Sequence, residues 1–259
     1  MKRLLLIILC LQIPAIFLKG QVIPYQPGEK VSWVIRYGLV TGGVATFELK
    51  KDTFAGREVY HSIFMAKTTG LAEALYTIKD IYESYMEPND EMPVCAIRNV
   101  QEGHYRRYNP VTFDRDTRAD SAILTSNLTG KHVTQKDIRD VISFYYYFRR
   151  NWLATDYPFK KGEIITVMTW FTDELFPISM VYVGTEMVRT KAGRIKCYKF
   201  NPVTEIGRIF KTNEDVSIWF SADKNNLPVK VRFDIFVGAF TAELISYEGL
   251  VAPLEIVEK

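Results

Sequence analysis

The feature that most constrains how this chain can fold is a two-residue alternation of apolar and polar side chains, repeated along most of the sequence. Val31, Trp33, Ile35 and Tyr37 alternate with Ser32 and other side chains in one such segment. Successive side chains of a β-strand point to opposite faces, so this period is the one a strand needs to bury one face. The chain is therefore expected to form strands, each with one buried face.

The same alternation predicts about a dozen strands, separated by turn residues such as Gly42-Gly43, Ala192-Gly193 and the polar run at 223–226. Helices do not alternate with these segments, so the strands are expected to pair antiparallel. An open sheet of this size curls or closes. The predicted fold is all-β and mainly antiparallel, a curved sheet or barrel-like single domain over residues 21–259. The predicted strands are 31–37, 45–50, 58–66, 77–87, 94–101, 103–108, 163–171, 178–190, 194–201, 215–221, 227–236 and 239–248.

One segment has helical spacing and predicts a single helix near residues 137–152. Thr134 followed by Asp137 is expected to form its N-terminal cap, with the carboxylate near the positive end of the helix dipole. Apolar residues at spacings of three and four are expected to lie against the sheet. These residues are Ile138, Val141, Tyr145, Phe148 and Trp152. The polar stretch 109–133 is weakly patterned and is interpreted as a long connection.

The first twenty residues have the composition of a cleavable secretory signal. Lys2 and Arg3 precede an apolar stretch, residues 4–18, which is shorter than the roughly 20 apolar residues that span a bilayer. Cleavage is expected after Gly20. Cys10 lies inside the apolar stretch and is not expected to carry a lipid. The protein is therefore expected to be exported, to the periplasm or beyond.

Removal of residues 1–20 changes the charge balance. It takes away Lys2, Arg3 and Lys19 but no acidic residue, so the formal charge of +3 falls to zero. A neutral protein has no general attraction to nucleic acid or to an anionic membrane, so no nucleic-acid partner is expected. No later segment is long and apolar enough to cross a bilayer, and the mature protein is expected not to be membrane-spanning.

Two cysteines, Cys95 and Cys197, follow the signal segment. An oxidising compartment permits a disulfide between them. Both lie in segments predicted to be strands, where a small buried thiol fits equally well. The sequence leaves the two alternatives open.

Motifs of known enzymes are scarce. His61, His104 and His132 are far apart and have no metal-binding spacing, and no nucleophile elbow or glycine-rich phosphate loop is present. The acidic run 114–120 has a basic residue where a calcium loop needs an oxygen ligand, and it is interpreted as a solvated turn. No metal and no cofactor is expected. A hydrolase site assembled across strands remains an alternative.

Two groups of polar residues are candidates for a ligand-binding site. Alternation puts Asp80 and Tyr82 on one side of a strand, and Asp140, Tyr146 and Arg149 lie along the polar flank of the predicted helix. Each group has a structural alternative that stays open. The first can be an ordinary wall of the sheet. The second can be an arginine–carboxylate clamp that holds the helix to the sheet.

The aromatic content also favours a binding cavity without choosing its occupant. Aromatic residues make up 14% of the chain, with 15 tyrosines. Their faces suit sugars and lipid chains, and they also serve β cores. The basic and tyrosine-rich stretch 104–108 could meet an anionic sugar or phosphate, or form an ordinary exposed strand.

Several local patterns follow one another along the chain. They are Gly28-Glu29-Lys30-Val31, Asp80-Ile81-Tyr82-Glu83-Ser84, Asp140-Val141-Ile142-Ser143-Phe144-Tyr145-Tyr146, Gly193-Arg194-Ile195-Lys196-Cys197 with Pro202, Trp219-Phe220-Ser221 and Leu227-Pro228-Val229. Together, from about residue 26 to residue 249, they resemble a known family, the exported bacterial proteins grouped as domain of unknown function 3108. The resemblance implies an envelope location and a barrel-like all-β fold, but no activity and no catalytic residues. With Gln21 at its expected mature start, the chain also resembles secreted proteins of the Bacteroidetes type.

These observations lead to one favoured function and two alternatives. The favoured one is a non-enzymatic periplasmic or envelope protein that binds an apolar or glycan ligand, a lipid or a sugar, in a curved β-sheet. The first alternative is a structural or protein-interaction component of envelope assembly, with an envelope protein as partner and no small ligand. A sizeable apolar cavity separates these two hypotheses. The second alternative is an unrecognised hydrolase, with Asp80, Asp140 and Arg149 as the residues to inspect first.

Overall fold

A computed structural model describes residues 23–155, 157–203 and 215–257 of the chain. The expected signal peptide and cleavage site lie outside the described residues. Fifteen strands form one sheet, with two short helices and a π-helical turn. The strands are β1 (Lys30–Tyr37), β2 (Val40–Phe54), β3 (Arg57–Thr68), β4 (Lys79–Met86), β5 (Pro93–Glu102), β6 (Tyr105–Asp114), β7 (Ser121–Ser126), β8 (Gly130–Gln135), β9 (Arg139–Asp140), β10 (Ile164–Phe171), β11 (Glu174–Thr190), β12 (Gly193–Pro202), β13 (Val216–Ser221), β14 (Pro228–Asp234) and β15 (Ala239–Glu248). The helical elements are α1 (Leu71–Leu75), α2 (Val141–Phe148) and η1 (Arg149–Leu153).

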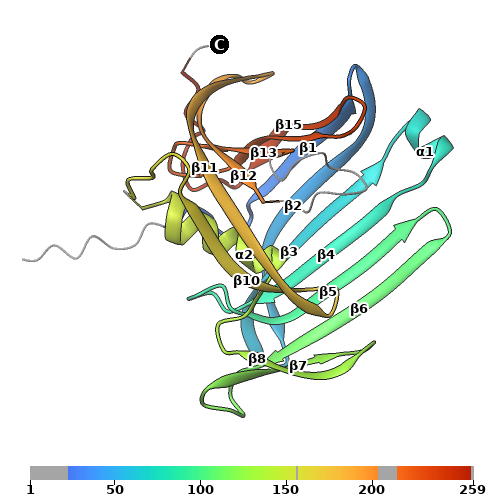
Figure 1. The fold of residues 1–259 in the computed structure, drawn as a ribbon, viewed down its shortest axis with the longest axis vertical. Helices are drawn as coiled ribbons and strands as arrows, with labels where there is room; N and C mark the ends of the chain where they lie inside the picture. Colours follow the sequence, from blue (N-terminus) through green and yellow to red (C-terminus); the bar gives the residue numbers. More distant parts are fainter. Residues whose placement is uncertain (1–22, 156, 204–214, 258–259) are drawn as a thin grey trace, which may run out of the picture.

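The sheet is curved and almost entirely antiparallel, which confirms the predicted fold class. Its strand order is β8-β7-β6-β5-β4-β3-β2-β1-β15-β14-β13-β12-β11-β10-β9, so β1 beside β15 joins the first and last strands of the chain. The two-residue strand β9 pairs parallel with β10. Figure 1 shows β1 to β8 as one curved wall, with β10 to β12 crossing opposite it and α2 between the two.

The two ends of the sheet approach each other through side chains. Trp170 of β10 packs in one buried cluster with Val111, Phe113 and Leu124 of β6 and β7. The neighbouring hairpin, where β10 meets β11, ends against the inner face of β4 to β6. A sheet this large and this twisted buries its inner face best by curling on itself.

Helix α2 fills the space inside the curve, but it starts later than the sequence predicted. The predicted cap, Thr134 followed by Asp137, is wrong: Asp140 is the N-cap, and Ser143 completes a capping box. Its buried side chains include Ile142, Phe144 and Tyr146, which meet sheet residues on several sides. The predicted apolar stripe is therefore only partly right: Phe148 is buried, but Tyr145 is only half-buried. A helix enclosed by a curved sheet buries more than one face, so its buried residues do not follow a single stripe.

The prediction of a long connection over residues 109–133 is wrong. Strands β6, β7 and β8 occupy most of it, and Val111, Phe113 and Leu124 are buried. The buried alternation is interrupted by Asn109 and Ser126, which point inward and pair with each other by a 3.0 Å hydrogen bond. Polar residues in buried positions of a strand hide the period that the sequence argument relied on.

Other expectations concern single residues. Cys95 and Cys197 are both buried and free. Asp223 accepts hydrogen bonds from two backbone N–H groups of the turn between β13 and β14, as turn chemistry predicts. Within the described ranges, no helix has both the length and the apolar character that crossing a membrane requires.

Candidate functional site

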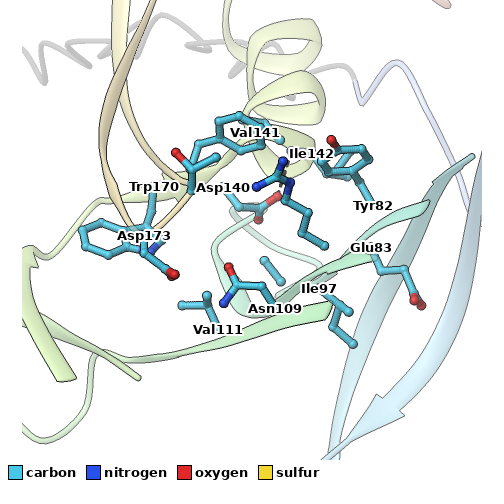
Figure 2. Close-up of a pocket in the computed structure, with 14 residues that line it drawn as sticks. Tyr82, Glu83, Ile97, Asn109, Val111, Asp140, Val141, Ile142, Trp170 and Asp173 are labelled. Carbon is cyan, nitrogen blue, oxygen red and sulfur yellow. Dashed lines mark hydrogen bonds between the residues drawn. The ribbon is translucent and has the colours of Figure 1, made fainter. Parts of the chain in front are cut away.

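A small cavity lies where the end of the β10–β11 hairpin meets the inner face of β4, β5 and β6, close to the start of α2 (Figure 2). Its volume is about 40 Å³, and its lining is mostly apolar. Sites that enclose a whole small molecule are roughly 300–1,000 Å³. This cavity can therefore receive one group of a ligand but not an entire ligand.

The hairpin that forms one wall has an unusual backbone. Phe171 pairs with Glu174, which leaves Thr172 and Asp173 as a two-residue turn. Both have positive φ, 53° and 65°. Such turns normally use Asn-Gly, because a β-branched residue such as threonine is disfavoured at positive φ. Strained backbone of this kind gathers at functional sites.

The side chain of Asp173 is buried in this wall without a hydrogen bond. Only 3% of it is exposed, and its nearest cation is Arg107 Nη2 at 3.5 Å. Neither carboxylate oxygen has a hydrogen-bond partner in the described part of the chain. A carboxylate can accept several hydrogen bonds, and buried polar atoms in folded proteins almost always have a partner. Both oxygens of Asp173 therefore have unused capacity to accept hydrogen bonds.

Buried donors without partners lie near the same wall. Within the described ranges, Trp170 Nε1, Arg98 Nε and Arg107 Nε have none. The Arg98 guanidinium also lies 5.3 Å from the ring centre of Phe171. The region thus combines acceptors, donors and aromatic faces.

The floor of the cavity is fully hydrogen-bonded. Asp140 Oδ1 accepts from the N–H groups of Ile142 and Ser143, and its Oδ2 accepts from Ser84 Oγ at 2.7 Å. Burial nevertheless raises the pKa of the Asp140 carboxyl, because the hydrogen bonds do not fully offset the loss of water. Beside it, the Asn109 amide donates to Ser126.

Further along β4, more polar groups extend the site towards the hairpin ends. Asp80 Oδ1 accepts from the N–H of Gln101 at 3.0 Å. Burial, with Asp80 next in effect, raises the pKa of the Glu102 carboxyl. Burial also raises the pKa of Tyr82, although the neighbouring Arg98 opposes this shift. We call Asp80, Arg98, Glu102, Arg107 and Asp173 the mouth cluster.

Three of the five sequence-predicted site residues meet in this region. Tyr82 and Asp140 line the cavity, and Asp80 lies on the same face of β4 as Tyr82. Their ligand binding stays a prediction. Sequence reasoning missed Trp170 and Asp173, although a Thr-Asp pair between two predicted strands was a visible sign of a tight turn.

Tyr146 and Arg149, predicted to lie on a polar flank of the helix, are instead buried and do not line the cavity. Tyr146 is 1% exposed and Arg149 is fully buried. Arg149 donates to both carboxylate oxygens of Glu29, at 2.6 and 2.8 Å, and to the carbonyls of Pro24 and Asn225. These hydrogen bonds form the arginine–carboxylate clamp that was the structural alternative for this group, and the clamp holds the helical segment to the start of β1.

The other candidate chemistries have ordinary surroundings. His61 lies between Asp52 and Glu83, at 3.1 and 2.8 Å, rather than beside a serine. Asp114 accepts three hydrogen bonds from the two residues that follow Arg115, as a solvated turn does. Among the residues that the structure describes, no three His, Cys, Asp or Glu side chains form a group that could hold a metal.

Comparisons with known proteins agree with the fold. A comparison with curated proteins gave no match. One solved structure, a beta-barrel-like protein of domain of unknown function DUF1849 from Brucella abortus, superposes with a TM-score of 0.55 at 7% identity, covering 86% of this chain and 98% of the other. That likeness supports the barrel-like fold alone. The sequence profile of the proteins of unknown function called DUF3108 matches residues 32–245, and the chain therefore belongs to the DUF3108 family.

Proposed function

We propose that the protein is an exported, non-catalytic binding protein of the cell envelope, and that it holds a glycan by inserting one sugar group into the cavity at the mouth cluster. The observation that carries the proposal is Asp173, a buried carboxylate with no hydrogen-bond partner in the described part of the chain. Ligand sites combine apolar walls with a few placed polar groups, which is the composition found here.

A sugar group suits the chemistry of this wall. Its hydroxyls can donate to the carboxylate of Asp173 and accept from Trp170 Nε1 and from the guanidinium of Arg98. Its C–H faces can pack on the aromatic ring of Tyr82, which lines the same cavity. The ligand body would then extend along the hairpin ends, where Tyr105 is 48% exposed.

An apolar chain suits the interior less well. The space inside the curve is filled by aromatic side chains, with Phe47 stacked on Tyr145 at 4.7 Å and Phe148 against Phe200 at 5.2 Å. The cavity of about 40 Å³ leaves no room for an acyl chain. The glycan branch of the sequence hypothesis is therefore the one we carry forward.

Binding can be tested by calorimetry with a panel of neutral, amino-containing and acidic oligosaccharides. Asp173→Asn should weaken binding, because the amide nitrogen that replaces one carboxylate oxygen cannot accept a hydrogen bond from the ligand. Glu174→Gln is the matched control, since Glu174 is the exposed neighbour in the same hairpin and its loss should leave affinity unchanged. Binding of fatty acid without sugar would favour the apolar branch. Release of reducing ends from the oligosaccharides would favour the hydrolase.

Export needs a separate test. The motivation is the charged and apolar segment before Gly20. Protein recovered from the periplasm of a native-like host should lack about twenty residues and carry no lipid on Cys10, as judged by intact mass. A membrane-bound product that retains residue 1 contradicts this part of the proposal.

The protein-interaction role is the second candidate, and exposed apolar residues favour it. Leu39 is 100% exposed, Leu75 of α1 is 88% exposed and Val237 is 74% exposed. They lie on hairpin ends that Figure 1 draws at one end of the sheet. Apolar surface gathered in this way marks interaction sites. If this second role is correct, a variant with serine at all three positions should fail to complement a deletion strain, while Asp173→Asn should still complement it.

A further inference from the structure

A second concave region lies at the other end of β5 and β6, and it shares no lining residue with the cavity at the mouth cluster. Its volume is about 470 Å³, which is within the usual range of ligand sites. We call it the arginine cleft. Its charged lining consists of Arg57, Glu87, Asp90, Arg115, Asp116, Lys136, Asp137 and Arg139.

Arg115 has no carboxylate partner in the described ranges. Its three nitrogens donate instead to the carbonyls of Lys136, Pro93 and Ile138, at 3.1, 2.5 and 3.2 Å. Burial lowers the pKa of the Arg115 guanidinium to about 10; Asp90 opposes this shift and the nearby Arg139 adds to it. Two like charges are therefore held close together where water is scarce.

Arg139 is also without an ion pair among the described residues. Only its Nη1 donates, to the carbonyls of Asp90 and Glu91 at 3.0 and 2.9 Å, and its guanidinium lies 3.9 Å over the ring of Tyr147. Its Nε and Nη2 donate to no described residue and are not among the fully enclosed atoms. Burial lowers the pKa of this guanidinium too.

Two of the four acids that line the cleft, Glu87 and Asp116, are ion-paired with Arg57, at 3.7 and 2.8 Å. Asp90 and Asp137 form no ion pair with Arg115 or Arg139 among the described residues, although Asp90 lies close enough to act on the charge of both. Lys136 adds a third cation at the rim, and its Nζ donates only to carbonyls, those of Arg118 and Ala119. The half-buried guanidinium of Arg115 and the buried one of Arg139 are held by carbonyls alone. With a lysine beside them, they have the donors and the charge that an anion needs.

We propose that the arginine cleft binds a phosphoryl group, held by Arg115 and Arg139 with Lys136 at the rim. A guanidinium has five N–H donors, of which Arg115 uses three and Arg139 two on carbonyls. The remaining donors belong to two side chains that line the same cleft. They match the several oxygens of a phosphate better than the two oxygens of a carboxylate. The proposal does not depend on the glycan site, because the two regions have separate linings.

The test compares charge-preserving variants in one cleft. Affinities for inorganic phosphate and glycerol phosphate are measured by calorimetry. Binding to vesicles of phosphatidylcholine, with and without phosphatidylglycerol, is measured by sedimentation. Arg115→Lys and Arg139→Lys should each weaken phosphate binding by about tenfold or more, because lysine loses the forked donor geometry. Arg57→Lys, in the same cleft but already ion-paired, should change the affinity by less than about twofold.

Lys136→Gln guards against a folding artefact, since Lys136 is exposed and its change should not disturb the core. This variant should lower phosphate affinity and weaken its salt dependence. Asp173→Asn should leave phosphate affinity unchanged, which separates this site from the glycan site. Binding of free phosphate but not of the phosphatidylglycerol vesicles indicates a soluble phosphate ligand. Binding of those vesicles but not of free phosphate indicates a lipid headgroup. The proposal is overturned if none of these probes binds, or if Arg57→Lys weakens binding as much as the other arginine variants.

Discussion

Two arginine–carboxylate pairs in this protein, each with a buried carboxylate, differ in how many hydrogen bonds that carboxylate accepts. In the pair inside the curve, Arg149 holds both oxygens of Glu29 at 2.6 and 2.8 Å. In the pair at the mouth cluster, Arg107 lies 3.5 Å from Asp173, and neither oxygen of that carboxylate has a hydrogen bond to any described residue.

The difference separates a structural role from a binding role. Burying a charge is costly unless hydrogen bonds and an opposite charge replace the lost water. Glu29 has both replacements, so it fastens helix to sheet and leaves nothing for a ligand. Asp173 has a cation at 3.5 Å but no hydrogen bond to a described residue, so its hydrogen-bonding capacity is unused. Burial alone therefore does not make a residue a candidate for binding, and the missing hydrogen bonds are what make Asp173 the residue we propose.

The largest expected effect is on the satisfied pair. Arg149→Met leaves the Glu29 carboxylate buried without its cation, and breaking a buried pair in this way costs about 3–5 kcal/mol. Urea unfolding followed by tryptophan fluorescence measures the loss. Glu29→Gln combined with Arg149→Met should be less damaging than the single change, because no charge is left unpaired. Wild-type-like unfolding of the single variant contradicts the clamp.

The unsatisfied region should respond in the opposite direction. Replacing Thr172-Asp173 by Asn-Gly removes an unpartnered buried carboxylate and puts the preferred residues at positive φ. The free energy of unfolding should rise by about 1–3 kcal/mol, while oligosaccharide binding is lost. Calorimetric melting measures the gain. A loss of stability would mean that Asp173 is a structural residue like Glu29, and the comparison would fail.

The fold was largely predictable because the alternation is local. Strands such as β1 have an apolar side chain at every second position, and one strand is enough to read that period. The failures came where the inner face is polar. In β6 and β7, Asn109 and Ser126 satisfy each other across the sheet, and that pairing depends on a register that the sequence does not show.

The site was predictable only in part, for a similar reason. Asp80 and Tyr82 share a strand, so their common face follows from alternation. Arg149 and Glu29 are 120 positions apart, and nothing local distinguishes an arginine that has met a carboxylate from one that has not. The same holds for Asp173, because the absence of a partner depends on the whole fold.

Two tyrosines predicted as site residues give a smaller test of the comparison. Tyr146 accepts a 3.0 Å hydrogen bond from Ser62 deep inside the curve, so Tyr146→Phe should cost about 1 kcal/mol and leave binding unchanged. Tyr82 lines the cavity and its ring is the proposed platform for the sugar, so Tyr82→Leu should weaken oligosaccharide binding. Chemical denaturation and calorimetry on both variants make the comparison. If the Tyr146 variant lost binding and the Tyr82 variant did not, Tyr146 would belong to the binding site instead of Tyr82.

The smallest effect concerns Asp140, which stands between the two cases. It is fully hydrogen-bonded, as Glu29 is, but has no salt bridge within the described ranges. Its carboxyl pKa is raised by burial in the folded protein, so the native state favours the protonated form. A carboxyl with a raised folded pKa adds stability below its unfolded pKa, about 3.9, and loses that contribution as pH rises through the folded value.

Asp140→Asn keeps a good N-cap but cannot titrate. The difference in the free energy of unfolding between wild type and variant should therefore shift in favour of the wild type as pH falls from 7 towards 4. Urea unfolding of both proteins at several pH values measures this difference, and the other titrating groups cancel because they are common to both. Parallel curves would mean that the hydrogen bonds from Ser84, Ile142 and Ser143 fully replace water at this carboxylate. A satisfied carboxylate would then need no cation, and the missing hydrogen bonds alone would distinguish Asp173 from Glu29.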